Sequence, residues 1–249
     1  MPAREAPCEM VTVETARGPL LVPYEVRRSA RARRIRLSLG PRNQAVLSVP
    51  ARGSVREALR FLQSQGDWLE RHLRAAPAPT GLDRHLTRHP RLSGLGREFA
   101  VEVNFTTARP FYIFSEASGE AVFRFPAGEK AEAALGGLLR EFAEEVLPRR
   151  VLELAGRAGL RVGRVSVRDQ GTRWGSCSAR RVISLNWRLV LLPAALHDYV
   201  IWHELAHLTE MNHSTHYWNL LRAYDPKTDA HDRALTRAGR ELMRLGRGS

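Results

Sequence analysis

The stretch His203-Glu204-Leu205-Ala206-His207, followed six residues later by His213, decides how the rest of the chain must be arranged. Two histidines four residues apart lie on one face of an α-helix, and both imidazoles can reach a single metal ion. Glu204 projects from the same turn, offset enough to reach a water on the ion and not the ion itself. The spacing therefore predicts one zinc ion on a helix, with Glu204 as general base.

The third ligand is open to three candidates. His213 stands at the distance found in the metzincin pattern His-Glu-x-x-His-x-x-Gly-x-x-His, but Glu210 occupies the place of the turn glycine. The pattern therefore argues against a true metzincin. A turn could still bring His213 back to the ion, so we expect His213 to complete the set, with His216 and Glu210 as rivals.

The C-terminal half has the alternation of helix and strand that such a motif needs. Apolar residues at helical spacing predict a helix from about residue 129 to Gly159, kinked or restarted at Pro148. Strand-like spacing follows at Val162–Val167 and again over residues 182–191. Pro193 suits the first turn of the helix that carries the motif, and a last helix is expected over residues 229–245.

The N-terminal half is predicted to be rich in β structure. Short strands are expected around residues 10–22, 34–39, 45–50, 99–103 and 121–125. One helix is expected over residues 54–75, because Ser54 and Glu57 form a capping box. Residues 76–81 have the composition of a linker or an exposed loop. We therefore predict a β-rich region over 1–128 and an α+β catalytic domain over 129–249.

Composition limits the location of the protein. No apolar run reaches the roughly 18–20 residues of a membrane span. Met1–Met10 lacks the continuous apolar core of a secretory signal. Cys8 and Cys177 are too far apart in sequence to suggest a disulfide framework, which favours the cytoplasm.

Cys177 is expected to be a small buried thiol rather than a redox or latency ligand. His85 and His89 lie in a polar stretch and are expected at the surface.

The formal charge of +13 admits a polyanionic partner. Almost all of the cations are arginine, and six of them lie without an acidic neighbour between Arg27 and Arg36. The simplest interpretation is a solvated strand face with its flanking loop. The alternative is a patch that binds the phosphates of a nucleic acid.

Several segments together resemble one family. Arg173-Trp174-Gly175-Ser176-Cys177, then Ser184–Leu189, Tyr199-Val200, the His203–His207 motif, Asn212-His213-Ser214 and Trp218 are similar to the YgjP-like metallopeptidases, relatives of the SprT-like and WLM proteases. The resemblance runs through most of residues 129–220. It implies a zincin-like fold, metal on His203, His207 and His213, and a catalytic Glu204.

Other residues near the motif have less certain roles. His216 stands where relatives commonly have an aromatic residue, which places an additional imidazole near the metal. Arg173 and Trp174 belong to the family pattern, and Arg173 is expected to hold either a substrate or transition-state oxygen or an internal carboxylate. In zincins a strand near the active-site helix can also accept an extended peptide, and the strand after Val182 is adjacent in sequence to that helix.

The resulting hypothesis is a cytoplasmic zinc metallopeptidase that acts on peptide or protein substrates, with no membrane partner. Three alternatives keep the metal. The first is a hydrolase of nucleotide phosphoanhydrides, in which the ion and the arginine cluster serve phosphate. The second is a DNA-associated protease similar to the SprT-like relatives. The third is a nucleic-acid-binding module with a structural metal.

Overall fold

The computed structural model describes residues 9–40, 43–75, 81–107 and 109–246, and the chain divides between residues 80 and 81 into two compact units. Its described residues form a mixed α+β fold, which confirms the predicted class. The predicted boundary at residue 128 lies inside the second unit. Within the described residues, no helix is both long enough and apolar enough to span a membrane.

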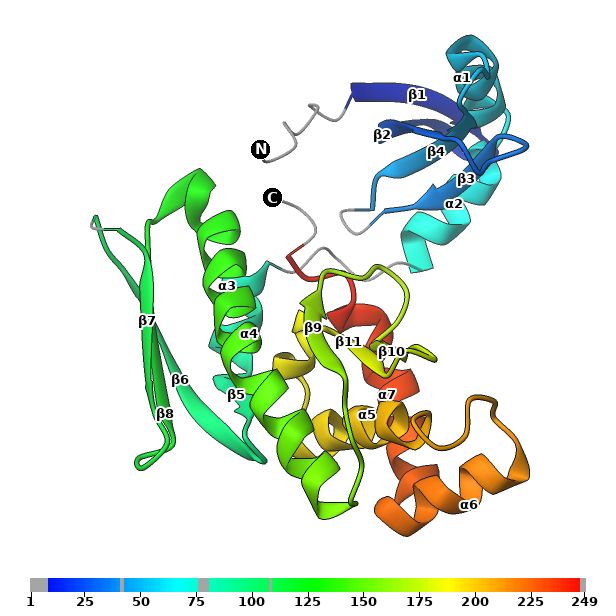
Figure 1. Cartoon of the computed structure of the whole chain (residues 1–249). Helices are drawn as coiled ribbons and strands as arrows, with labels where there is room; N and C mark the ends of the chain where they lie inside the picture. The colour runs from blue at the N-terminus through cyan, green and yellow to red at the C-terminus, as the bar shows by residue number, and fades with distance from the viewer. Residues whose placement is uncertain (1–8, 41–42, 76–80, 108, 247–249) are drawn as a thin grey trace. The chain divides into compact units, whose positions relative to one another are not determined.

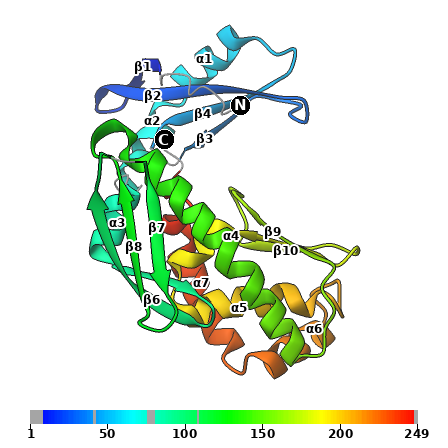
Figure 2. The same cartoon turned by 60° about the vertical axis from the view of Figure 1, so that its left-hand side comes forward.

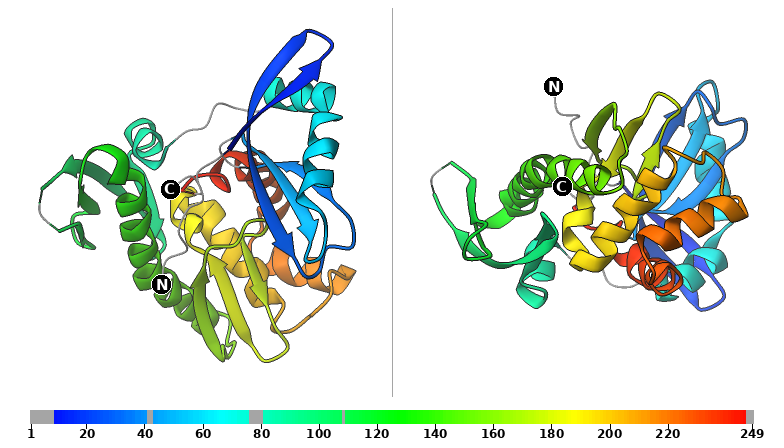
Figure 3. Two further views of the ribbon diagram at one scale, coloured as in Figure 1. Left: turned by 90° about the horizontal axis from the view of Figure 1, so that it is seen from above. Right: turned by 60° about the horizontal axis from the view of Figure 1, so that its bottom comes forward.

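The first unit is a four-stranded sheet with two helices. Its strands, in the sheet order β1-β2-β4-β3, are β1 (Glu9–Thr15), β2 (Gly18–Ser29), β4 (Ala45–Pro50) and β3 (Arg36–Leu39). β1 and β2 form a hairpin, β3 pairs antiparallel with β4, and β2 pairs parallel with β4. Strand residues such as Val22 and Leu47 share one core with Leu62 and Leu69 of the helices. Figure 3 shows the two helices beside this sheet.

The single helix predicted over residues 54–75 is two helices, α1 (Val55–Gln63) and α2 (Gly66–Ala75). The predicted N-cap is confirmed, since the Glu57 amide donates to Ser54 Oγ at 3.3 Å, which is one of the two hydrogen bonds of a capping box. The break follows from close packing at Gly66. A Cβ at that position would lie 1.8 Å from the Glu14 carbonyl oxygen, so the second helix begins where only glycine fits against β1.

The second unit begins with a helix and a second four-stranded sheet. The helix is α3 (Leu82–Arg88), and the strands in the order β5-β6-β8-β7 are β5 (Arg91–Gly94), β6 (Arg97–Phe105), β8 (Glu120–Phe125) and β7 (Phe111–Ser115). Phe99 and Phe123 from this sheet meet Phe142 edge to face at 5.9 and 6.0 Å between ring centroids. The sheet therefore shares its core with the C-terminal half, which explains why the division falls at residue 80.

A long helix, α4 (Ala131–Arg157), follows the short 3-10 helix η1 (Gly128–Lys130) and runs between the two sheets of this unit (Figure 1). It continues without restart through Pro148. The expected stop is confirmed, since Gly159 has a φ of +64° and the Leu160 amide donates to the Ala155 carbonyl at 2.8 Å. Buried Arg150 pairs with Asp198, which ties α4 to the helix that carries the histidine motif.

The third sheet is small and lies beside that helix. β11 (Val182–Asn186) is its central strand, parallel to β9 (Arg164–Arg168) and antiparallel to β10 (Gly175–Cys177). The strand predicted over 182–191 is therefore too long. Residues 187–191 form the 3-10 helix η2 (Trp187–Leu191), because the side chain of Asn186 accepts from the Arg188 amide at 3.1 Å and starts a helical turn.

Three helices complete the second unit: α5 (Ala194–Ala206), α6 (Thr215–Tyr224) and α7 (Thr228–Leu242). α5 and α7 were expected, whereas α6 was not predicted, although Tyr217, Leu221 and Tyr224 have the spacing of one helical face. Ser214 caps α6 by accepting from the Tyr217 amide at 3.3 Å. Figure 2 shows α5 and α7 next to each other below the small sheet. This arrangement places the C-terminal end of α5 under β10.

Candidate metal centre

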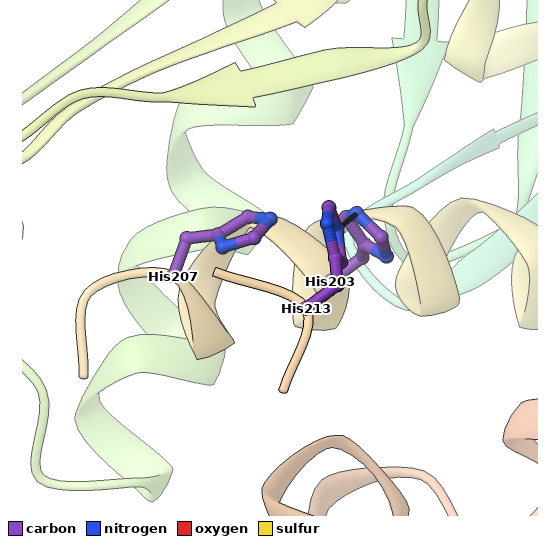
Figure 4. Close-up of side chains that lie close together, drawn as sticks. All are labelled: His203, His207 and His213. Carbon is purple, nitrogen blue, oxygen red and sulfur yellow. Dashed lines mark hydrogen bonds between the residues drawn. The ribbon is translucent and has the colours of Figure 1, made fainter. Parts of the chain in front are cut away.

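Three histidines converge at the end of α5. His203 lies on the helix, His207 caps its C-terminus, and His213 stands in the loop before α6 (Figure 4). One ring nitrogen from each lies within 4.8 Å of the others, and the Nε2 atoms of His203 and His213 are 3.3 Å apart. These are the only three metal-binding side chains so grouped in the described residues. The structure thus brings together the three predicted ligands.

The protonation state of these imidazoles suits a metal. Burial, together with the charges of His207 and His213, lowers the pKa of His203 to about 4. Burial also lowers the pKa of His207. Metals bind the neutral form of imidazole, so His203 and His207 are ready to bind at neutral pH. Nitrogen donors also exclude Mg²⁺ and Ca²⁺ as natural occupants, since both prefer oxygen.

Neighbouring groups fix the orientation of the histidines. Nδ1 of His207 lies 3.0 Å from the carbonyl oxygen of Glu210, so its Nδ1–H can donate there and leave Nε2 facing the other two rings. The buried ring of Tyr217 stacks on His207 at 4.6 Å between centroids. Its hydroxyl donates to the carbonyl oxygen of His203 at 3.1 Å. α6 therefore holds two of the three histidines in place.

Glu204 lies beneath β10 and is almost fully enclosed. It is 5% exposed, and a Cβ at Gly175 would lie 2.5 Å from its Oε1. The pKa of Glu204 is raised to about 8, mainly by burial, although the positive charge of Arg173 has a smaller effect in the opposite direction. Glu204 and His203 line a cavity of about 180 Å³. A carboxyl group that shares a small cavity with one of the three histidines can exchange a proton with a bound water or substrate.

The remaining predicted residues fall into two groups. Arg173 and Trp174 line the cavity with Glu204. His216 is exposed and is not grouped with the three histidines, and Glu210 contributes its carbonyl to His207 rather than its carboxylate. Cys177 is half-buried and also outside the histidine group, and burial raises the pKa of its thiol to about 11. At neutral pH this thiol is protonated, which suits a packing residue.

Several residues of the site were not predicted from the sequence. Tyr217, which supports two of the histidines, lies in the unpredicted helix α6. Asp232 and Leu235 reach the cavity from α7. Tyr199 could have been inferred, since it precedes His203 by one helical turn and the family pattern contains it. No local sequence pattern indicates that Asp232 belongs to the site, because only the packing of α7 on α5 brings it to the cavity.

The prediction that His85 lies at the surface is wrong. His85 is 7% exposed, and burial together with the charge of His89 lowers its pKa to about 4. Leu82 and Leu86 of α3 pack into the core and carry His85 inward with them. His85 and His89 border a larger cavity of about 430 Å³ at the N-terminal end of α5. This cavity contains none of the residues of the histidine cluster.

The crystal structure of the metallopeptidase zymogen of Pyrococcus abyssi abylysin matches 38% of this chain and 97% of its own, with 22% identity and a TM-score of 0.35. Similarity at that level says nothing about the site. Among curated proteins, none matches the sequence. Residues 33–238 match the YgjP-like, metallopeptidase domain, and the chain therefore belongs to this family of metal-dependent hydrolases.

Proposed function

We propose that the protein is a zinc-dependent peptidase whose single ion is held by His203, His207 and His213. One distance between ligand atoms supports zinc. Zinc binds imidazole nitrogen at about 2.0–2.1 Å in tetrahedral geometry, which requires ligand nitrogens about 3.3–3.4 Å apart. The Nε2 atoms of His203 and His213 are 3.3 Å apart. Three protein ligands also leave the fourth position open, as a catalytic site requires.

Glu204 is proposed as the general base. A zinc ion at the three histidines would polarise the scissile carbonyl and lower the pKa of a bound water to about 7. Glu204 lies on the turn between His203 and His207 and faces the cavity. In this proposal the charge of a bound zinc ion would favour the ionised form of Glu204, and its carboxylate would take the proton of the attacking water and deliver it to the leaving nitrogen. Its enclosure under Gly175 keeps bulk water away from that proton.

Arg173 is proposed to stabilise negative charge. Its guanidinium acts electrostatically on Glu204 from the same cavity, and no carboxylate lies within ion-pair distance of it among the described residues. This favours a substrate or transition-state oxygen as its partner over an internal carboxylate. Trp174 packs on α7 next to Gly239 and is proposed to form the wall of the substrate cavity.

The sheet order supports a peptide or protein substrate. β11 lies in the centre of its sheet and β10 at the edge, so the free edge lies next to Glu204. An extended peptide can add to such an edge through main-chain hydrogen bonds. We infer that the substrate lies along β10, with its scissile carbonyl over the three histidines. We also propose a cytoplasmic location, since two cysteines far apart in the sequence do not suggest a disulfide framework.

A substrate screen tests this proposal. Zinc-loaded protein is incubated with an unstructured polypeptide, with nucleoside triphosphates, and with the polypeptide plus DNA at increasing salt. Polypeptide cleavage that falls at least about 100-fold in Glu204→Gln, with zinc content unchanged, is the expected result.

The other outcomes identify the alternatives. Hydrolysis of triphosphates alone would replace the peptidase with a phosphoanhydride hydrolase. Cleavage that requires DNA and weakens with salt would identify a DNA-associated protease acting through the arginines between Arg27 and Arg36. Bound zinc without turnover of any substrate would indicate a structural metal.

A further inference from the structure

A carboxylate from α7 borders the same cavity as His203 and Glu204. Asp232 lies on the exposed side of α7, and its Oδ1 accepts a hydrogen bond from the Tyr199 hydroxyl at 3.0 Å. Tyr199 in turn packs against His203, with ring centroids 6.3 Å apart. The position of Asp232 is thus fixed relative to the histidines by one hydrogen bond and one ring contact.

Asp232 differs from its acidic neighbours in its partners. Asp225 pairs with His231 at 2.6 Å, and Asp229 pairs with Arg222 at 3.1 Å. Among the residues that the structure describes, Asp232 has no cationic partner. A carboxylate offers about four acceptor positions on its two oxygens, and Tyr199 occupies one. The charge of Asp232 is therefore available to a molecule that enters the cavity.

The cavity has charges of opposite sign. Arg173 acts on Glu204, whereas Asp232 is bonded to Tyr199 and makes no ion pair with Arg173. The lining also includes the apolar side chains of Trp174, Val200 and Leu235. A cavity with apolar walls and a carboxylate suits a group with a hydrocarbon stem and a cationic tip, since such side chains bury the stem and keep the charge paired.

We propose that Asp232 is a specificity-determining residue that binds a cationic nitrogen of the substrate next to the scissile bond. This inference rests on the proposed peptidase function. The nitrogen can come from the side chain of a lysine or arginine, or from the free α-amino group of the peptide. Both are positively charged hydrogen-bond donors, so Asp232 could bind either one. The experiment below distinguishes the side-chain nitrogen from the α-amino group.

Asp232→Asn is the decisive variant, because the amide oxygen can still accept from Tyr199 while the charge is lost. Peptides blocked at both ends carry either lysine or its neutral isostere norleucine next to the cleaved bond. In the wild type kcat/KM is expected to favour lysine. The lysine-to-norleucine ratio should fall about tenfold to a hundredfold in Asp232→Asn, as expected for loss of a charge-assisted hydrogen bond.

Asp229→Asn is the matched control. It removes the same charge from α7 outside the cavity and should leave the lysine-to-norleucine ratio unchanged. A second series compares acetylated and free N-termini on norleucine peptides. If the ratio of kcat/KM for free peptides to that for acetylated peptides falls in Asp232→Asn while the lysine-to-norleucine ratio does not, the nitrogen is the α-amino group.

A binding measurement separates this inference from the proposed function. Calorimetry on the Glu204→Gln protein measures the Kd of the lysine and norleucine peptides without turnover, with and without Asp232→Asn. Tighter binding of lysine that depends on Asp232 supports the inference even if no peptide is cleaved. The inference is overturned if Asp232→Asn leaves the lysine-to-norleucine and free-to-acetylated ratios of kcat/KM unchanged, and the lysine-to-norleucine ratio of Kd unchanged as well. The peptidase proposal would then still stand.

Discussion

Gly175 on the edge strand β10 lies directly against Glu204 on α5: a Cβ at residue 175 would lie 2.5 Å from Oε1 and 2.8 Å from Cδ of the carboxylate. Real Cβ contacts are not that short, so any side chain at this position must displace Glu204. The glycine in the segment Arg173-Trp174-Gly175 therefore sets how closely the strand approaches the proposed base. It also explains why this carboxylate is buried.

Gly175→Ala should lower peptidase activity about tenfold to a hundredfold, because a displacement of Glu204 by about 1 Å disturbs the geometry of proton transfer. Zinc content should not change, since the three histidines are not touched. Steady-state kinetics and metal analysis measure the two effects. Gly137→Ala is the control, because a Cβ there has nothing within 4 Å. Full activity in Gly175→Ala would mean that the position of Glu204 does not limit catalysis.

His213→Ala should weaken zinc binding by at least about 100-fold, since loss of an outer-shell partner already costs up to that factor. His216→Ala is the matched control three residues away, because His216 is exposed and outside the histidine cluster. Competition with a fluorescent chelator measures both affinities. An equal loss of zinc affinity in the two variants would show that His216 shares the ion. An unchanged zinc affinity in His213→Ala would mean that another residue is the third ligand.

Tyr217→Phe keeps the ring against His207 and removes the hydrogen bond to the His203 carbonyl. The free energy of unfolding should fall by about 0.5–1.5 kcal/mol. Denaturation by urea on the metal-free protein measures this. Tyr224→Phe on the same helix is the control, since no hydrogen bond from its hydroxyl is found among the described residues. If both substitutions have the same effect, the Tyr217 hydroxyl does not stabilise the end of α5.

His197 makes the stability depend on pH. It is 0% exposed, and neither ring nitrogen has a hydrogen-bond partner among the described residues. Burial is the main reason that its pKa is lowered to about 4; the charge of Asp198 opposes this shift and the charge of Arg150 adds to it. The unfolded chain binds this proton near the ordinary pKa of about 6.5. Stability should therefore fall as the pH drops from about 6.5 to 4, by about 3 kcal/mol from this group.

His197→Leu removes the titrating group and should flatten this part of the profile. At pH 7 the variant should be at least as stable as the wild type, because two unpartnered polar atoms leave the core. Urea unfolding at several values between pH 4.5 and 7.5 gives the difference between the two proteins, in which contributions from other groups cancel. Parallel profiles would mean that His197 is hydrated or paired in the folded protein.

Local patterns along the chain were sufficient to predict much of the metal centre. Helical periodicity places His203 and His207 on one turn without any knowledge of the fold, since the spacing of an α-helix is set by its backbone. The Ser54 cap and the stop at Gly159 follow from local hydrogen bonding and from the conformational freedom of glycine. Each of these features depends on residues within a few positions of one another.

Contacts between distant segments decided the rest. Gly66 ends the continuous helix only because β1 lies against it, and the sheet of residues 91–125 joins the second unit only because its phenylalanines pack on Phe142. Burial of His85 depends on which face of α3 meets the core. Asp232 reaches the cavity 28 residues after Glu204 because α7 packs on α5. Packing between elements depends on side chains that no local pattern relates, so only the tertiary structure reveals it.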